Sequence, residues 1–387
     1  MKALNQLKTF QRILDEYPAD TPLGKFLPGF YRQNKQMGST DRRVAGRLVY
    51  NYFRLGKALV DLPADERLVV AEFLCNAQVN SFLQHFRPEW ALCAEMPIAK
   101  KLQMVKDVYP GFKLEDVFPW ADRLSPGIDK QAFLKSYFTQ PDLFIRVRKG
   151  FETQVKAELN RAGVNFKDEG NNCISMPNGT RLETIFQAQH WFEVQDYSSQ
   201  QTANFFKPAK WESWWDACAA SGGKSLLLHE LEPNLKLVVS DIRESVLANL
   251  DERFQRSGLH KYQKKIIDLT QNVDPELHDY AFDGIILDAP CSGSGTWGRT
   301  PEMISQFSRQ RIDFFNGLQK AIVSNVVKYL KPGKPLIYIT CSVFKAENED
   351  VVDYIVNELG LKVEEQTILK GYGRKADTMF AARLVKS

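Results

Sequence analysis

From residue 210 to the C-terminus, apolar segments of strand length alternate with amphipathic segments of helix length. LKLVVSD, FDGIILDAP and PLIYITC are short and apolar. Residues 311–330 instead carry apolar side chains at helical spacing and end at Lys331-Pro332-Gly333, a helix stop. Apolar strands that alternate with helices are typical of a parallel sheet covered on both faces. We therefore expect an α/β fold whose sheet is mostly parallel.

The preceding residues have different patterns. About the first 125 residues predict helices, and several prolines between 110 and 141 mark a looser stretch with a domain boundary. Residues 140–200 then combine a strand (LFIRVRKG), a helix that ends at Gly163 and a short strand (NCISMP), the pattern of a small α/β unit. We expect a helical domain at 1–128, a small α/β domain at 129–200 and the parallel-sheet domain at 201–387.

The clearest N-terminal helix is expected to begin near Ser39-Thr40-Asp41, a good N-cap sequence. On a helical wheel, one face carries Val44, Leu48, Tyr52 and Leu55, and the opposite face carries Arg43, Arg47 and Arg54. Residues 1–60 hold 11 Lys and Arg against 4 Asp and Glu, although the net charge of the chain is only +4. The arginine face is therefore either a solvated charged face or a surface that contacts nucleic-acid phosphates.

Composition limits the cellular compartments and the kinds of chemistry that we expect for this protein. No apolar run reaches the roughly 18 residues needed to cross a bilayer, and the N-terminus has no apolar signal core, so we expect a cytoplasmic protein. The six cysteines form no CxxC pair, and the five histidines give no cluster with zinc spacing. We expect a monomer without a metal site or a membrane partner, whose cysteines serve as packing residues or nucleophiles.

Ligands of parallel α/β sheets bind at the carboxyl ends of the strands, and here several strand ends carry charged or reactive residues. The first expected strand runs into DACAASGGK at 216–224. The Gly222-Gly223 pair of this small-residue turn lets backbone N–H groups approach an anionic group. A phosphate-binding P-loop would need glycine where the chain has Cys218, so a nucleoside triphosphate is not expected.

Two further strands end in acidic residues. Asp241 follows the glycine-rich turn by about 20 residues, which suits a hydrogen bond to a ribose diol. Taken alone, an N-cap for the next helix is the simpler interpretation of this aspartate. Asp268 ends the third strand and could bind an adenine amino group, but it is uninformative by itself.

Thiols follow the last two strands. Asp288-Ala289-Pro290-Cys291 comes directly after an apolar strand and leads into a Gly/Ser loop that ends at Thr296, an order that core packing does not require. Cys341 follows the strand that ends in YIT. A lone cysteine there would usually be a packing residue, but beside Cys291 on a neighbouring strand Cys341 becomes a candidate nucleophile.

These segments together resemble the Sun/Fmu (RsmB-like) family of RNA 5-methylcytosine methyltransferases. The resemblance covers roughly residues 195–387 and rests on DACAASGGK at 216–224, DAPCSGSGT at 288–296 and TCS at 340–342, with VQDYSSQ at 194–200 at the domain entrance. The segment STDRRVAGRLVYNYFR at 39–54 resembles the family's N-terminal helical domain, of the NusB type. The chain departs from the family at Ser221, where proline is usual, and at Thr378-Met379, where Gly-Phe is common.

The resemblance implies a Rossmann-like class I methyltransferase domain, with a mostly parallel seven-stranded sheet and S-adenosyl-L-methionine as cofactor. It implies that carbon 5 of an RNA cytosine is methylated, with 16S ribosomal RNA favoured as the substrate. The alternatives are a transfer-RNA cytosine-C5 methyltransferase and a catalytically silent RNA-binding factor in ribosome assembly. Enzymes that methylate exocyclic amines carry Asn/Asp-Pro-Pro-aromatic where this chain has DAPC, which argues against that chemistry.

In the implied mechanism, Cys341 attacks cytosine C6, Asp288 contacts N3, and Cys291 assists elimination of the C5 proton. DNA 5-methylcytosine enzymes instead use the cysteine of a Pro-Cys motif, and by that analogy Cys291 and Cys341 would exchange roles. The implied cofactor site comprises Cys218, Ala219, Ala220, Ser221, Gly222, Gly223, Lys224, Asp241, Asp268 and Asp288. The candidate RNA-binding residues are Arg43, Arg47 and Arg54.

Overall fold

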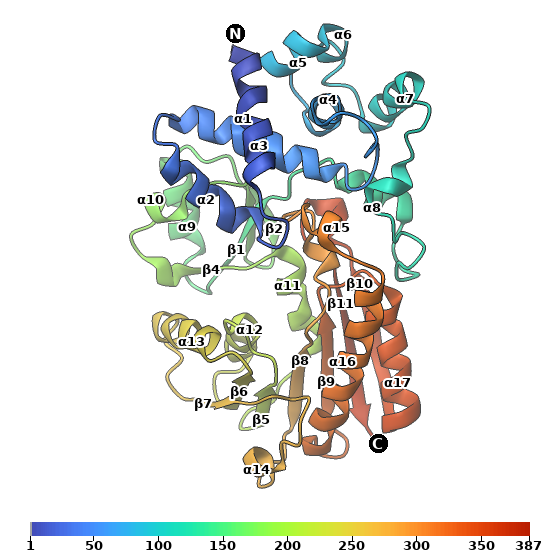
Figure 1. Ribbon diagram of the computed structural model, residues 1–387. Coiled ribbons are helices and arrows are strands. Elements are labelled where there is room, and N and C mark those ends of the chain that lie inside the picture. Colours follow the sequence, from blue (N-terminus) through green and yellow to red (C-terminus); the bar gives the residue numbers. More distant parts are fainter. Residues whose placement is uncertain (1) are drawn as a thin grey trace. The chain divides into compact units, whose positions relative to one another are not determined.

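The computed structural model describes residues 2–387, which divide into two compact units (Figure 1). One unit comprises the residues up to 122 together with 129–141 and 296–309, and the other comprises 123–128, 142–295 and 310–387. The second unit joins the small α/β segment to the parallel-sheet segment. This division does not test the expected domain boundaries at 128 and 200, which stay predictions.

The first unit is built from helices, as the sequence predicts for the N-terminal region. One 3-10 turn, η1 (Leu114–Val117), precedes the last helix before residue 141. The helices are α1 (Lys2–Glu16), α2 (Leu23–Gln33), α3 (Ser39–Arg54), α4 (Ala64–Cys75), α5 (Ser81–Phe86), α6 (Pro88–Ala91), α7 (Ile98–Val108), α8 (Lys130–Ser136) and α15 (Met303–Gln306).

The helix α3 begins where the sequence predicts, with Gly38 as its N-cap, and Asp41 accepts the Gly38 N–H at 3.3 Å. The prediction that Arg54 lies on an exposed arginine face is wrong, because this residue is only 1% exposed. Its guanidinium donates to the carbonyl oxygen of Tyr137 at 2.9 Å and to Oε1 of Gln140 at 2.6 Å. Because these internal partners hold the guanidinium, Arg54 is not available to an RNA phosphate.

The other two arginines of the predicted face differ from each other. Arg47 is half-buried and pairs with the buried carboxylate of Glu72 at 2.9 Å, so it neutralises an internal charge. Arg43 is exposed. Of the three predicted RNA-binding residues, Arg43 is the one whose side chain lies at the surface.

The second unit contains a four-stranded antiparallel sheet with the order β2-β3-β1-β4. The helix α9 (Glu152–Arg161) packs on it through Val155 and Leu159. The strands β1 and β3 confirm the two predicted strands, whereas β2 carries the polar sequence KDEG and has no strand signal. The strands are β1 (Leu143–Val147), β2 (Lys167–Gly170), β3 (Cys173–Met176) and β4 (Phe192–Val194).

The second unit also contains the predicted parallel sheet, with seven strands in the order β10-β11-β9-β8-β5-β6-β7. The pairs β5–β6, β6–β7, β5–β8 and β8–β9 are parallel, and β11 alone is antiparallel to its two neighbours. The strands are β5 (Ser213–Asp216), β6 (Lys236–Asp241), β7 (Gln263–Ile266), β8 (Gly284–Asp288), β9 (Pro335–Thr340), β10 (Leu361–Leu369) and β11 (Met379–Lys386).

Helices cover both faces of this sheet. On one face, α12 and α13 pack through Leu228, Leu250 and Phe254 against strand residues such as Val239 and Ile337. Figure 1 shows α16 and α17 side by side along β9–β11. Besides α9, the helices of the second unit are α10 (Leu182–Ile185), α11 (Tyr197–Gln201), α12 (Gly223–Leu231), α13 (Glu244–Arg256), α14 (Asp274–Leu277), α16 (Gln310–Val326) and α17 (Glu349–Leu359).

Within residues 2–387, none of the helices combines the length and the apolar composition that a membrane crossing requires.

Candidate active site

The strands of the seven-stranded sheet are added to β5 in two directions. β6 and β7 follow on one side of β5, and β8 and β9 on the other, so the switch point lies between β5 and β8. Ligands of such sheets bind at this point, at the carboxyl ends of the strands. A cavity of about 560 Å³ opens there, a size typical of small-molecule sites. Its lining includes Cys218, Ala220, Asp241, Arg243, Asp268, Asp288, Cys291, Leu318, Ile322 and Cys341.

The turn between β5 and α12 has a left-handed backbone at Ala220 (φ +47°) and Gly222 (φ +81°). A Cβ at Gly222 would lie 2.3 Å from a ring carbon of Phe254, so this position needs glycine for space as well as for φ. The Ala220 N–H donates to Asp241 at 3.1 Å, which helps to hold the strained turn. Of the predicted cofactor-binding residues in this turn, Cys218 and Ala220 line the cavity. The others, all among the residues that the structure describes, do not: Ala219, Ser221, Gly222, Gly223 and Lys224.

Ser221 stands where the family resemblance leads us to expect proline, and it makes contacts that proline could not replace. Its hydroxyl accepts a hydrogen bond from Arg253 Nη1 at 3.1 Å. Arg253 in turn pairs with Glu193 at 2.7 Å. The departure from the family therefore ties the turn to α13 through a side chain.

Asp241 lies at the cavity and is held by a residue close to it in sequence. Its Oδ1 accepts the backbone N–H of Arg243 at 3.0 Å, and both of its oxygens accept from the Arg243 guanidinium, at 2.9 and 3.0 Å. Burial would raise the pKa of Asp241, but the hydrogen bonds and the charge of Arg243 outweigh it and lower the pKa. The N-cap interpretation is wrong, because the N-cap of α13 is Arg243 and no side chain caps this helix; Asp241 instead binds Arg243 at the cavity.

Asp268 also lies at the cavity, where it accepts the Thr270 N–H at 3.0 Å and the Thr270 hydroxyl at 2.7 Å. These bonds lower the pKa of Asp268. The structure therefore places an ionised carboxylate at each of the two acidic strand ends.

Lys224 and Asp288 form an ion pair at 2.7 Å across the switch point. Their side chains are 13% and 27% exposed, so the pair is well shielded from water. Burial lowers the pKa of Lys224, but the charge of Asp288 and the hydrogen bond to it outweigh this effect, and the net shift is upward. The sequence predicts both residues in the site, but not that they bind each other.

The two predicted thiols lie together at the cavity, with 3.2 Å between Cys291 Sγ and Cys341 Sγ. The hydrogen bond to Cys341, burial and the nearby carboxylate of Glu347 raise the pKa of Cys291 well above its usual range. Either sulfur can be the donor in this contact. Cys341 also interacts electrostatically with Lys224, whose pKa it helps to raise.

A buried glutamate that the sequence did not single out binds both cysteine loops. Glu347 accepts the backbone N–H of Ser292 at 2.8 Å and the hydroxyl of Ser342 at 2.7 Å. Gln319 donates to the same carboxylate at 3.0 Å and to the carbonyl oxygen of Pro290 at 3.0 Å. Glu347 lies 55 residues from Ser292 in the chain, so no local spacing could have indicated this contact.

A second acid that the sequence did not single out is Asp216, at the end of β5. It is fully buried, and its Oδ2 accepts the Ser225 hydroxyl at 2.6 Å. Its Oδ1 has no hydrogen-bond partner among the described residues. Burial, with a contribution from the charge of Asp288, raises the pKa of Asp216 to about 7. A strand-end aspartate at the start of the DACAASGGK motif is the signal that could have drawn attention to it.

The order of the seven strands and the cavity at their switch point are those of a Rossmann-like methyltransferase fold. Residues 203–384 match the model of the family described as 16S rRNA methyltransferase RsmB/F. These residues are similar to the RsmB/F family, which confirms the resemblance to Sun/Fmu proteins.

Known proteins agree with this assignment. The ribosomal RNA small subunit methyltransferase B of Salmonella paratyphi B is 32% identical over 277 residues, which are 66% of this chain and 62% of that protein. The first three curated relatives are matched over only 37%, 51% and 62% of their own lengths. The chain therefore spans less than two thirds of the relatives it matches.

Two solved structures share the fold at low identity. The crystal structure of PH0851 covers 92% of this chain and 93% of its own, with a TM-score of 0.70 and 20% identity. NSun6 from Pyrococcus horikoshii, solved with SFG, covers 69% of this chain and 97% of its own, with a TM-score of 0.59 and 17% identity. At these identities the likeness concerns the fold alone.

Proposed function

We propose that the protein methylates carbon 5 of a cytosine in RNA, with S-adenosyl-L-methionine as the methyl donor and small-subunit ribosomal RNA as the substrate. The observation that carries the proposal is the thiol pair Cys291 and Cys341, whose sulfurs lie 3.2 Å apart at the cavity. Addition at cytosine C6 and elimination at the neighbouring C5 each need a reactive group. Two sulfurs in contact can serve two adjacent ring atoms.

The cavity suits S-adenosyl-L-methionine in size and in chemistry. Ile242, Ile267 and Leu269 provide apolar contacts for an adenine ring, and Asp268 is the acceptor for its amino group. Asp241 would hold the ribose hydroxyls, which requires Arg243 to give up at least one carboxylate oxygen. When bound there, the cofactor supplies an electrophilic methyl group. The chain's own residues must then make C5 nucleophilic.

We assign the nucleophile to Cys341. The raised pKa of Cys291 makes its attacking thiolate form scarce, and Lys224 interacts electrostatically with Cys341. Both observations favour Cys341 over Cys291 as the attacking thiol. Attack of the Cys341 sulfur on C6 moves electron density toward N3 and C5. Asp288, which forms an ion pair with Lys224, would contact N3 of the ring and stabilise the covalent adduct.

Cys291 then serves as the base for elimination. Cys291 first releases its proton to solvent. The thiolate that remains is strongly basic because of the high pKa of Cys291, and it can accept the C5 proton. The bond between C6 and sulfur breaks, and its electron pair returns to Cys341. The target base must leave its stack before any of these steps.

Methyl transfer to RNA tests the proposal directly. Unmodified small-subunit RNA, incubated with the protein and radiolabelled S-adenosyl-L-methionine, should yield labelled 5-methylcytosine at a defined position. Label on an exocyclic amine or on ribose would overturn the C5 assignment. Cofactor binding without any RNA label would instead favour a catalytically silent RNA-binding factor in ribosome assembly.

Calorimetry tests the cofactor site separately. Asp241→Ala should weaken S-adenosyl-L-methionine binding by about ten- to a hundredfold, the value of a charge-assisted hydrogen bond. Arg243→Ala is the matched control, because it removes the competing partner and leaves the carboxylate in place. An unchanged dissociation constant in Asp241→Ala would contradict the ribose assignment.

A further inference from the structure

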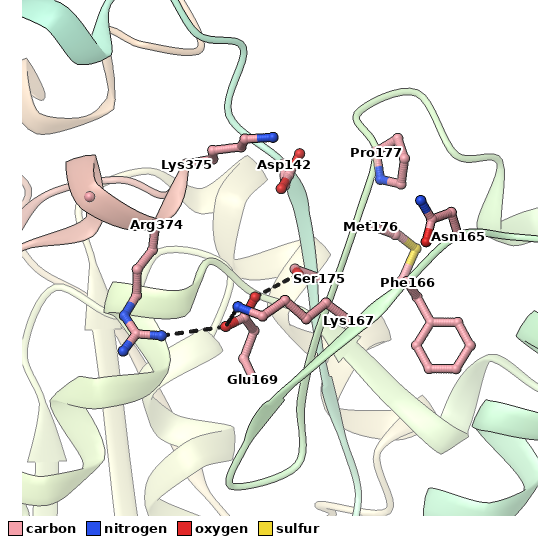
Figure 2. Close-up of a pocket in the computed structure, with 11 residues that line it drawn as sticks. Asp142, Asn165, Phe166, Lys167, Glu169, Ser175, Met176, Pro177, Arg374 and Lys375 are labelled. Atoms are coloured by element: carbon pink, nitrogen blue, oxygen red, sulfur yellow. Dashed lines mark hydrogen bonds and ion pairs between the residues drawn. The ribbon is translucent and has the colours of Figure 1, made fainter. Parts of the chain in front are cut away.

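A second hollow, of about 690 Å³, lies between the β2–β3 edge of the small sheet and the loop that follows β10 (Figure 2). Its charged lining comprises Lys167 and Glu169 from β2, Arg374 and Lys375 from the loop, and Asp142 just before β1. The proposed methylation chemistry uses none of these residues. The hollow is larger than the cavity at the switch point and is rich in cations.

Glu169 fixes two of the cations at the hollow. Its side chain is only 6% exposed and pairs with Lys167 at 2.8 Å and with Arg374 at 3.4 Å, as Figure 2 shows. The Ser175 hydroxyl donates to its other oxygen at 2.8 Å. Burial would raise the pKa of Glu169, but these partners outweigh it and lower the pKa, so the carboxylate stays ionised. One buried anion therefore orients two cations and leaves them with further N–H donors.

Arg374 is held on a second side by an aromatic ring. Its guanidinium carbon lies 5.0 Å from the centre of the Tyr197 ring, a cation–π distance. An arginine that is fixed by a carboxylate and a ring loses little freedom when it binds a further anion, and its planar donors match a phosphate.

Lys375 supplies a charge without an internal counter-ion. It is exposed and forms no ion pair with any of residues 2–387. Its backbone is left-handed (φ +52°), and its carbonyl oxygen accepts the Asp142 N–H at 2.8 Å. A left-handed lysine is strained, and such strain is concentrated at sites that bind ligands.

The remaining wall of the hollow is less charged. Phe166 lines the hollow beside Asn165 and is half-buried at the margin of the core of the small sheet (Figure 2). Its ring points away from Arg374 and Lys375, as Figure 2 shows, and packs against the core of the small sheet. The cations are therefore the part of this hollow that can bind a ligand.

The loop of this hollow is bonded directly to the cysteine loops. The Thr378 N–H donates to the carbonyl oxygen of Gly295 at 3.0 Å, and the Gly295 N–H donates to the carbonyl oxygen of Cys341 at 2.9 Å. Lys375 precedes Thr378 by three residues, so their Cα atoms are at most about 11 Å apart. The cations therefore lie within a few nucleotides' reach of the thiols.

We propose that this hollow binds one nucleotide of the substrate RNA near the target cytosine, with its phosphate on Arg374 and Lys375. The proposal rests on the proposed function for its choice of RNA as the ligand. It adds a second contact that positions the strand, separate from the cavity where the cytosine reacts.

Binding of a short, unstructured, fluorescein-labelled oligoribonucleotide with one cytosine tests this site without cofactor and without turnover. The double variant Arg374→Glu/Lys375→Glu should bind it at least about tenfold more weakly. The slope of log K against log salt should fall by about 0.7 for each phosphate that the variant no longer neutralises. The matched control is Lys236→Glu, an exposed lysine at the opposite, amino end of β6.

Thermal unfolding of each variant checks that the fold is intact. Photo-crosslinking of an oligoribonucleotide with 4-thiouridine beside the cytosine should label the peptide around Lys375.

Equal losses of affinity in the double variant and in Lys236→Glu would show a diffuse charge effect and overturn the proposal, as would unchanged binding or crosslinks only elsewhere. These readouts need no methyl transfer. A protein that binds RNA at this hollow but transfers no methyl group would refute the proposed function alone. Normal methylation with full RNA affinity in the double variant would refute this site alone.

Discussion

The carboxylate of Glu347 accepts the backbone N–H of Ser292, the residue that follows Cys291, at 2.8 Å. Its other oxygen accepts the hydroxyl of Ser342, the residue that follows Cys341, at 2.7 Å. The two loops are also joined directly, because the Ser292 hydroxyl donates to Ser342 at 3.2 Å. One buried carboxyl group thus fixes the backbone after both thiols and keeps their sulfurs in contact.

Glu347→Ala should lower methyl transfer by about a hundredfold, the effect of a displacement of about 1 Å at a reacting group, and leave cofactor affinity unchanged. Loss of the acceptor for a buried N–H should also cost about 1–3 kcal/mol of stability. Glu347→Gln keeps the shape and one acceptor, so it should recover much of the rate. Turnover, calorimetry and urea unfolding measure the three effects. Equal rates in both variants and the natural protein would contradict the positioning role.

Removal of the Cys291 thiol should stall the reaction after methyl transfer, because the C5 proton then has no acceptor. Cys291→Ser should therefore accumulate a covalent protein–RNA adduct that needs S-adenosyl-L-methionine and runs as a slow band on a denaturing gel. Cys341→Ala should give no adduct and no product while binding cofactor normally.

The double variant without both thiols is the control for that experiment and should give no slow band. An adduct in Cys341→Ala, together with none in Cys291→Ser, would exchange the two roles. It would leave the enzyme class unchanged.

Asp216 should make stability fall as pH rises. Its pKa is raised from 3.8 to about 7 in the folded protein, so the folded state holds its proton more tightly than the unfolded chain does. Protonated Asp216 therefore contributes at most about 4 kcal/mol to the free energy of unfolding. This contribution is complete below pH 4 and is lost progressively between pH 4 and pH 7. In urea unfolding at pH 5 and pH 8, Asp216→Asn should show a smaller drop than the natural protein. Parallel pH profiles would mean that Asp216 is ionised throughout.

Gly222→Ala should destabilise the protein by more than its backbone conformation alone explains. The added Cβ would lie 2.3 Å from the Phe254 ring, and overpacking of this kind costs about 1–3 kcal/mol. Gly258→Ala is the matched control, because Gly258 has a similar φ of +74° but open space around its Cβ position. If thermal and urea unfolding show equal losses of stability in the two variants, the contact with Phe254 is unimportant.

The seven-stranded sheet could be predicted because its central strands are buried on both faces. β8 and β9 are continuous apolar runs, and the residues that follow them carry the two thiols. Any parallel sheet brings such strand ends to one edge, so the sequence was enough to predict that Cys291 and Cys341 meet. β2 could not be predicted in this way, because its residues are mostly exposed and polar and its pairing with β3 alone makes it a strand.

The parts that sequence patterns missed depend on contacts between distant segments. A helical wheel puts Arg54 with Arg43 and Arg47, but the wheel contains no information about residues 137–140, which supply the partners that bury Arg54. Glu347 lies just before α17, and its role depends on a backbone N–H far away in the chain. Partners of this kind become visible only once the chain is folded.

Residues 296–309 belong to the helical unit, although the residues on both sides of them belong to the other. Trp297, which is 1% exposed, packs on Phe307 at 4.8 Å between ring centres, and Phe307 packs on Trp120 at 5.1 Å. A truncated protein that starts at residue 201 would keep Trp297 and Phe307 and lose Trp120. The apolar rings would then face water in the middle of the catalytic fragment, which makes that fragment prone to aggregate. The N-terminal helices are in this sense a folding requirement for the segment that follows the Cys291 loop.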